Sequence, residues 1–357
     1  LTGDSIYDKT RYYSLKNTFA ISLLEGFNKW AKSGLKAFIA SELRHFTLPN
    51  TTGSTSYNEH NLSIGAQLSK AQGKTFHYNA TAETWLTGED AGQLKLDASA
   101  DLNFKLFGDT LSLTANGFFH RLNPTFYYRH YHSRHAWWDN NSMSKMLHTR
   151  LQGILHYQKT RTTLRIGIDE INNYAYFASS YTVNNGNRVN HAITVNQYGG
   201  AINLITVALS QDFTLGPLNW ESVITYQKSN NKTVVPVPDF NIYSNLYIKF
   251  KIARVLSCDF GADVRYFTKY FAPDYNPGLG QYTVQTNTAT DGTDSRIGIG
   301  NYPVANIYAN FHLKHTRFFI MMSHVNAGTG KKNYFFTPHY PLNQRILRFG
   351  LSWNFFN

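Results

Sequence analysis

The sequence predicts an all-β fold, a transmembrane antiparallel up-and-down β-barrel of about sixteen or more strands. Apolar and polar residues alternate strictly along much of the chain, and short connections alternate with long ones. No stretch approaches the eighteen consecutive apolar residues of a membrane-spanning helix. Residues 94–106 are the clearest case, because every even position is apolar and every odd one is polar or small. About ten residues suffice for a tilted strand to cross a membrane.

The alternation locates fifteen strands along the chain. In order, they are expected near residues 12–25, 34–46, 57–70, 75–87, 93–107, 110–121, 144–157, 162–178, 193–212, 217–228, 240–252, 255–270, 303–314, 317–326 and 343–356. Residues 18–30 also fit an amphipathic helix, but we interpret them as part of the first strand. Apolar residues occupy odd positions before Gly199 and Gly200, as at Ile193 and Val195, and even positions after them, as at Ile202 and Leu204. This change predicts a β-bulge inside the ninth strand.

The connections between these strands differ in length in a regular way. Short ones lie at 71–74, 107–109, 159–161, 216–217, 253–254 and 315–316, and long ones at 47–56, 122–143, 179–192, 229–239, 271–302 and 327–342. Residues 88–92 are a short exception among the long ones. Outer-membrane barrels have short periplasmic turns and long external loops. The pattern therefore predicts a single barrel domain over residues 1–357, located in the bacterial outer membrane.

An odd strand number raises a question about the N-terminus. If the last strand ends in the periplasm, residues 1–11 lie outside the cell before a descending strand. Bacterial barrels usually have an even number of strands. We expect that one strand has been missed or, in preference, that an N-terminal part is absent from this sequence.

Composition excludes several classes of function. The net charge is +12, but the basic residues are spread along alternating strands and do not form a recognition motif. Contacts with solutes in the lumen or with lipopolysaccharide therefore fit better than nucleic acid. A single cysteine, Cys258, allows no internal disulfide. No Gly-x-Ser-x-Gly motif occurs, and no catalytic residues or cofactor are predicted.

Charged residues on the polar parity of the strands are the first set of candidate functional residues. We predict that the lumen is lined by Lys36, Glu42, Arg44, Glu83, Lys95, Asp97, Asp101, Lys105, Arg150, Arg165, Lys249, Lys251, Asp259, Asp263, Arg265 and Lys314. Charged walls select solutes by sign. Alternatively, the charges only hydrate the wall or pair across strands. Across the tight turn at 253–254, pairing of Lys249 and Lys251 with Asp259 and Asp263 is the expected outcome.

The loop at residues 126–138 is rich in aromatic and basic side chains. Its candidate binding residues are Arg129, His130, His132, His135, Trp137 and Trp138. They could form a surface for a sugar or a lipopolysaccharide phosphate, or an ordered loop packed at or inside the barrel mouth. The histidine spacing matches no zinc motif, so no metal is predicted. The loop at 272–300 is long enough to fold into the lumen and narrow it.

The last third of the chain resembles the Bacteroidetes putative porin family. The similarity lies in residues 263–270, 272–277, 300–303, 311–319, 337–341 and 349–356, together with 17–28 near the start. The final segment reads Phe-Gly-Leu-Ser-Trp-Asn-Phe-Phe and is similar to the C-terminal signal of outer-membrane barrels. The resemblance implies an outer-membrane barrel with a longer N-terminal part. It also implies a pore, without identifying a solute.

These observations favour a pore through which small hydrophilic solutes diffuse. The alternative is a structural or partner subunit of a larger outer-membrane transport or secretion complex, with a plugged lumen. A ligand-gated uptake barrel for lipid or sugar would need an apolar or aromatic lumen, and the inward positions are mostly charged or amide. The expected partners are outer-membrane lipid, lipopolysaccharide and small hydrophilic solutes, with other outer-membrane proteins as partners under the alternative function.

Overall fold

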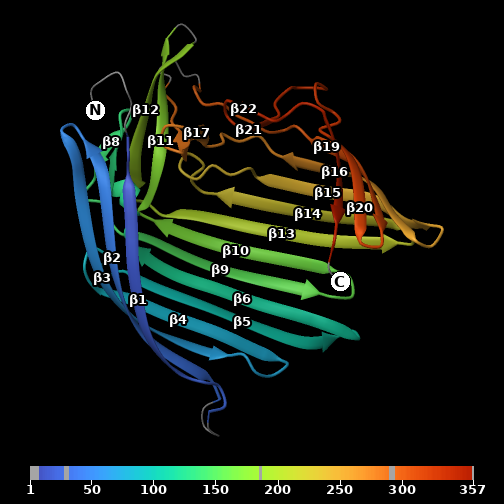
Figure 1. The fold of residues 1–357 in the computed structure, drawn as a ribbon, viewed down its shortest axis with the longest axis horizontal. Helices are drawn as coiled ribbons and strands as arrows, with labels where there is room; N and C mark the ends of the chain where they lie inside the picture. Colours follow the sequence, from blue (N-terminus) through green and yellow to red (C-terminus); the bar gives the residue numbers. More distant parts are fainter. Residues whose placement is uncertain (1–7, 28–31, 185–186, 289–293, 356–357) are drawn as a thin grey trace.

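The main element of the fold is a curved antiparallel sheet of fifteen strands (Figure 1). The computed structural model describes residues 8–27, 32–184, 187–288 and 294–355. Each strand pairs with the next strand of the wall along the chain, so the sheet is an up-and-down barrel wall. Its strands are β1 (Arg11–Leu23), β2 (Gly34–Asn50), β3 (Gly53–Lys70), β4 (Phe76–Thr87), β5 (Leu94–Leu106), β6 (Asp109–Leu122), β9 (Met146–Tyr157), β10 (Thr162–Asn172), β13 (Ile202–Leu215), β14 (Leu218–Ser229), β15 (Phe240–Ile252), β16 (Leu256–Phe267), β19 (Val304–Leu313), β20 (Thr316–Ser323) and β23 (Ile346–Trp353).

The fifteen predicted strands and their antiparallel order are thereby confirmed. Strand β1 forms one edge of the sheet and β23 the other, and these two are not paired with each other within the described residues. The helical alternative for residues 18–30 is wrong for the part that can be seen, because β1 continues to Leu23. Trp30 and Phe356, the last residue of the predicted final strand, lie outside the described residues.

The two faces of the wall differ in chemistry. Large apolar side chains remain exposed on one face, including Leu151, Ile168 and Leu246. Water would make such a surface unfavourable, whereas a lipid bilayer matches it. Polar and charged residues occupy the opposite parity of the same strands. We call this second side the inner face.

A second sheet explains where the sequence was misread. The predicted strands at 162–178 and 193–212 each run through two sheets, because β10 is followed by β11 (Tyr174–Asn184) and β13 is preceded by β12 (Asn187–Tyr198). Strands β11 and β12 leave the wall and pair with each other. Gly199 and Gly200 therefore join strands of two different sheets. The predicted bulge is wrong, and the parity flips because the chain changes sheets.

The long connections fold together at one end of the wall (Figure 1). Strands β12, β11, β18 (Gln281–Gln285) and β17 (Asp274–Asn276) form a four-stranded sheet. Two small hairpins pair β7 (His130–His132) with β8 (Trp137–Asp139) and β21 (Phe335–Thr337) with β22 (Tyr340–Pro341). A four-residue helix, α1 (Phe126–Arg129), precedes β7. We call these elements and the turns within them the cap.

The cap is held together by contacts between distant segments. Tyr128 stacks on Phe177 with ring centroids 4.4 Å apart. The Tyr131 hydroxyl donates to the Gly278 carbonyl at 3.2 Å, which connects the loop of α1 to the turn after β17. No helix among the described residues is long and apolar enough to cross a membrane.

The β2–β3 hairpin extends further than predicted. The expected loop at 47–56 is wrong, because the 17-residue β2 and the 18-residue β3 continue to a two-residue turn at 51–52. Phe46 and Leu48 lie on the inner face of this extension and are buried with Phe126 of α1. Phe46 stacks on Phe126 at 3.6 Å. The loop at 122–143 thus bends onto the inner face and buries a small apolar core there.

Candidate functional site

The register of the wall places the predicted lumen-lining residues on one face. Fifteen of the sixteen lie in strands on the inner face, and Lys314 lies in the turn after β19. The inner-face residues are Lys36, Glu42, Arg44, Glu83, Lys95, Asp97, Asp101, Lys105, Arg150, Arg165, Lys249, Lys251, Asp259, Asp263 and Arg265. That this face surrounds water stays a prediction.

A dense charge network lies on the inner face next to the cap. Arg44 of β2 forms ion pairs with Glu42 at 2.8 Å, with Glu59 at 3.4 Å and with Asp90 at 2.8 Å. Glu59 and Asp90 are buried. The turn between β4 and β5 positions Asp90, whose backbone N–H donates to the Asn61 side chain at 2.9 Å. Buried carboxylates need such partners, because desolvation penalises an unpaired charge.

Arg129 joins the cap to this network. Its guanidinium contacts Glu59 at 2.7 Å and Glu89 at 2.7 Å, and its Nε donates to the Pro124 carbonyl at 3.2 Å. Arg129 is buried. Arg129 was predicted to bind an external ligand, but its guanidinium instead bonds to groups of the same chain. These bonds attach the 122–143 loop to the wall.

The network contains acids that the sequence prediction missed. Glu59 and Asn61 are both polar and lie two positions apart on the inner face of β3. The alternation along β3 could therefore have identified Glu59 as an inward residue. Glu89 and Asp90 lie in a turn, where no strand parity applies. Their role could be recognised only once the turn had been placed beside Arg44 and Arg129.

A second polar cluster lies across β5, β6, β9 and β10. Asp169 is 2% exposed and accepts bonds from Arg150 at 2.7 Å and His148 at 2.7 Å. Asp97 pairs with His120 at 2.9 Å. A cavity of about 230 Å³ opens on the inner face there. Its lining includes Asn79, Asp97, Ser99, Asn116, Phe118 and Arg150.

A continuous polar row crosses the inner face beside this cavity. Through seven neighbouring strands, from β4 to β14, the paired residues are Asn79, Ser99, Asn116, Gln152, Gly167, Thr206 and Gln227. None of these side chains is apolar. Amide and hydroxyl groups both donate and accept hydrogen bonds, so the row can exchange partners with water or a hydrophilic solute.

Tyrosines of β15 and β19 cover another part of the inner face. The Tyr247 hydroxyl donates to Glu221 at 2.8 Å, and the Tyr308 hydroxyl donates to Asn245 at 2.8 Å. Gly261 makes room for both rings, since a Cβ there would lie 2.6 Å from Tyr247 and 2.7 Å from Tyr308. The sequence prediction, built on charges, did not single out this group.

Several inward cations have no acidic partner. The expected pairing of Lys249 and Lys251 is not found, because neither forms an ion pair within 4.0 Å among the described residues. Lys249 lies opposite Asp259 in register, but Asp259 lies 3.8 Å from His312. Asp263 accepts a hydrogen bond from Asn306 at 2.9 Å. The two lysines lie near the short-turn end of β15.

The predicted external-loop residues divide into buried and exposed members. His130 and His132 are buried, and both contact Asp139, at 2.8 and 3.0 Å. The other nitrogen of His132 faces the Pro49 carbonyl at 3.0 Å. Both partners of this ring, the Pro49 carbonyl and the Asp139 carboxylate, are hydrogen-bond acceptors. His135 and Trp137 are exposed, whereas the Trp138 indole donates to the Tyr127 carbonyl at 3.0 Å.

The electrostatics of the cap depend on this Asp139 cluster. Burial alone would raise the pKa of the Asp139 carboxyl, but hydrogen bonds from His130 and His132 outweigh it and lower the pKa below its ordinary value. Elsewhere in the cap, burial raises the pKa of Tyr128 to about 12, which agrees with its position under Phe177.

The cap should therefore loosen in acid. A carboxyl with a lowered folded-state pKa stabilises the fold above its unfolded-state value and loses this effect as the pH falls through the lower one. We expect the environment of Trp137 and Trp138 to change below about pH 3.9, the ordinary aspartate pKa. Tryptophan fluorescence against pH measures this change. Asp139→Asn should already show the acid signal at neutral pH, and an identical titration in that variant would contradict the assignment.

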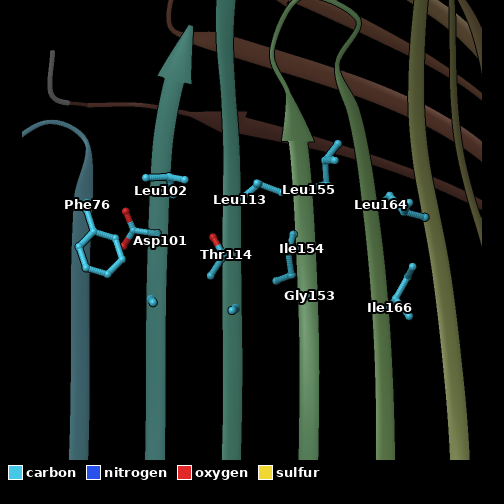
Figure 2. A pocket seen from close by; sticks show the side chains of 12 residues that line it. Phe76, Asp101, Leu102, Leu113, Thr114, Gly153, Ile154, Leu155, Leu164 and Ile166 are labelled. Atoms are coloured by element: carbon cyan, nitrogen blue, oxygen red, sulfur yellow. The ribbon is translucent and has the colours of Figure 1, made fainter. Parts of the chain in front are cut away.

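The outer face carries an apolar groove of about 450 Å³ across β4, β5, β6, β9 and β10 (Figure 2). Figure 2 shows side chains flanking it from neighbouring strands, while Gly153 contributes none. Its apolar lining includes Phe76, Leu102, Leu113, Leu155, Leu164 and Ile166. Such a groove belongs to the lipid-facing surface, although Asp101 and Thr114 of the opposite parity also contribute to its lining.

An up-and-down wall with an apolar exterior and a polar inner face defines an outer-membrane β-barrel protein. Comparison with known families agrees. The chain belongs to the family described as "Putative porin", whose pattern matches residues 2–357. The predicted porin family and the outer-membrane location are thus confirmed, and the Bacteroidetes origin stays a prediction. A search of the curated proteins found no match.

Solved structures of similar fold are outer-membrane receptors and transporters. The siderophore receptor PirA from Acinetobacter baumannii has a TM-score of 0.63 and 12% identity, covering 96% of this chain and 55% of its own. The copper transporter OprC has a TM-score of 0.59 and 10% identity, covering 98% and 57%. The ferric enterobactin receptor PfeA from Pseudomonas aeruginosa, solved with enterobactin, has a TM-score of 0.59 and 11% identity, covering 88% and 49%. At these identities the likeness shows the fold alone, and the chain spans about half the length of each.

Proposed function

We propose that this chain forms the wall of a porin-like channel through which small hydrophilic solutes diffuse across the outer membrane. The observation that carries the proposal is the row across seven strands of the inner face, in which six strands present an amide or hydroxyl side chain and β10 presents Gly167. A face that packed against a protein core would instead bury apolar side chains. Membership in the porin family supports the same function.

The charges on this face favour anions. Many inner acids are engaged by the chain itself: Glu42 by Arg44, Asp97 by His120 and Asp169 by Arg150. Lys36, Lys105, Arg165, Lys249 and Lys251 have no acidic partner within 4.0 Å in the described residues. Unpaired charges set the local field of a pore, so the proposed channel is net basic and prefers anions.

Planar-bilayer recording tests both parts of this proposal. The purified protein should give ion channels whose reversal potential in a salt gradient indicates anion preference. Lys249→Glu with Lys251→Glu should shift the reversal potential toward cations, because the two substitutions change the local charge by four units. Lys159→Glu with Arg161→Glu, in a short turn outside the wall, is the matched control. A folded barrel without channel activity would refute the pore, and an unchanged reversal potential would refute the role of the lysines.

A second function remains open because the cap reaches the inner face. Arg129 and Phe126 attach the 122–143 loop to the wall from inside, as expected for a subunit with a plugged lumen in a larger complex. Mild detergent extraction distinguishes the two functions. Reproducible co-purification of an outer-membrane protein favours the complex, and isolation as a lone barrel that conducts favours the pore.

The outer surface supports two further partners. The apolar groove of Figure 2 fits outer-membrane lipid chains. The exposed His135 and Trp137 of the cap could reach lipopolysaccharide. No nucleic-acid partner, metal or enzymatic activity is proposed.

A further inference from the structure

The cap contains a cavity that the proposed pore does not use. It measures about 820 Å³, within the range of about 300–1,000 Å³ typical of small-molecule sites. Four segments far apart in the sequence meet around it: the β7–β8 turn, the β11–β12 hairpin, the β17 region and the β21–β22 hairpin. Its side chains include three tyrosines and three histidines, Tyr181, Tyr275, Tyr340, His135, His191 and His339.

A buried carboxylate fixes the shape of this cavity. Asp274 is 4% exposed and accepts hydrogen bonds from the Tyr181 hydroxyl at 3.0 Å and from His339 Nδ1 at 3.2 Å. Tyr181 also stacks on His191 with ring centroids 4.7 Å apart. These contacts tie together three of the four segments. The lining is therefore preorganised, which lowers the entropic cost of binding a ligand.

Other polar groups of the lining are left without partners. Within the described part of the chain, the side chains of His135, Tyr275 and Tyr340 make no hydrogen bond. His339 Nε2 is also unbonded there, since only its Nδ1 faces Asp274. A hydroxyl both donates and accepts, and a neutral imidazole does one of each with its two nitrogens. A ligand that enters this cavity thus meets several free bonding groups beside aromatic rings.

The charge of the lining narrows the ligand class. Among the described residues, the lining contains no lysine or arginine, so no permanently cationic group is seen there to hold a phosphate or carboxylate. The Asp274 carboxylate is already engaged. Burial lowers the pKa of His191, which favours the uncharged ring. Ile193 is the one branched aliphatic side chain that the described part of the chain contributes to the lining, so an apolar ligand is poorly matched.

We propose that this cavity binds a neutral oligosaccharide. Sugar hydroxyls donate and accept, which matches the free tyrosine and histidine groups, and the apolar face of a pyranose ring packs on tyrosine. The site concerns the cap alone and holds whether or not the wall conducts ions.

A glycan array followed by calorimetry tests the site. The full chain, folded in detergent, is applied to an array of neutral, sialylated and sulfated oligosaccharides, and the best neutral one is titrated. Tyr340→Ala and His135→Ala are each expected to weaken its binding about tenfold, the loss of one aromatic or hydrogen-bonding contact. Phe336→Ala is the matched control, because Phe336 is an exposed aromatic next to β22 that does not line the cavity.

The outcomes separate clearly. The site is supported if the protein binds neutral glycans, if the two cavity variants bind them about tenfold more weakly, and if Phe336→Ala binds them as the unmodified protein does. Failure to bind any neutral glycan, a preference for sialylated or sulfated ones, or equal binding by all variants would overturn it. A heat-dependent mobility shift in gel electrophoresis confirms that each variant is folded. No conductance enters these readouts, so a failed pore leaves the test unaffected.

Discussion

Arg129→Ala is expected to detach the 122–143 loop from the barrel wall and to lower the free energy of unfolding by about 3 kcal/mol. The guanidinium is the 2.7 Å partner of the buried Glu59 and of Glu89. Without it, Glu59 retains Arg44 at 3.4 Å, shared with Glu42 and Asp90. A buried carboxylate with too little compensation is among the costliest defects a substitution can create.

Denaturant titration of the folded protein measures the stability, and limited proteolysis reports on the loop. Cleavage between residues 122 and 143 should become faster in Arg129→Ala. Arg134→Ala is the matched control, because Arg134 is an exposed arginine of the same loop whose side chain forms no ion pair in the described residues. If the two variants lost equal stability, the fastening role of Arg129 would be wrong. A larger bilayer conductance in Arg129→Ala would in addition indicate that the loop narrows the pore.

Gly88→Ala is expected to have the second large effect, because the turn between β4 and β5 leaves no space for a side chain. Gly88 has a φ of +90°, and a Cβ there would lie 2.0 Å from the His60 carbonyl oxygen and 2.5 Å from Asn61 Oδ1. Both neighbours belong to β3 and cannot move freely. Left-handed strain and overpacking together should cost about 3 kcal/mol or more. Glu89 and Asp90, which follow directly, should then be displaced from Arg129 and Arg44.

Gly92→Ala in the same turn provides the comparison. Its φ is also positive, +76°, but the nearest atom to a Cβ is Lys145 Cε at 3.8 Å. Only the strain remains, about 1 kcal/mol. Denaturant midpoints and the folded fraction after refolding distinguish the two variants. Equal losses would show that the approach to β3 is unimportant.

The strand positions could be predicted because one physical rule governs the whole wall. Each strand faces lipid on one side and polar groups on the other, so Leu96 and Asp97 alternate as their neighbours do. The rule fails where the surroundings change. In β2, outward Leu43 and inward Arg44 give way to outward His45 and inward Phe46. Beyond the membrane the pattern is inverted, because the outer face of the hairpin contacts water and its inner face packs against α1. The alternation expected for a membrane strand is therefore absent, and the segment was interpreted as a loop.

The candidate sites were less accessible to sequence reasoning. Strand parity placed Arg44 and Arg150 on the inner face, but their partners depend on the register between strands. Arg129 and Glu59 are separated by seventy positions in the chain, and no local pattern connects them. The cavity in the cap is assembled from four loops. Its individual residues were visible, as His135 was, but their convergence is a property of the folded cap.

The core formed by Phe46, Leu48 and Phe126 has a thermodynamic consequence. Strands of 17 and 18 residues are nearly twice as long as the roughly ten that a bilayer requires, so this core lies beyond the hydrocarbon. Other protein groups cover this core away from water, whereas lipid covers the apolar exterior of the wall. One chain is therefore stable in two solvents for two different reasons. Unfolding into aqueous denaturant should expose both apolar surfaces to water, and both should raise the heat capacity.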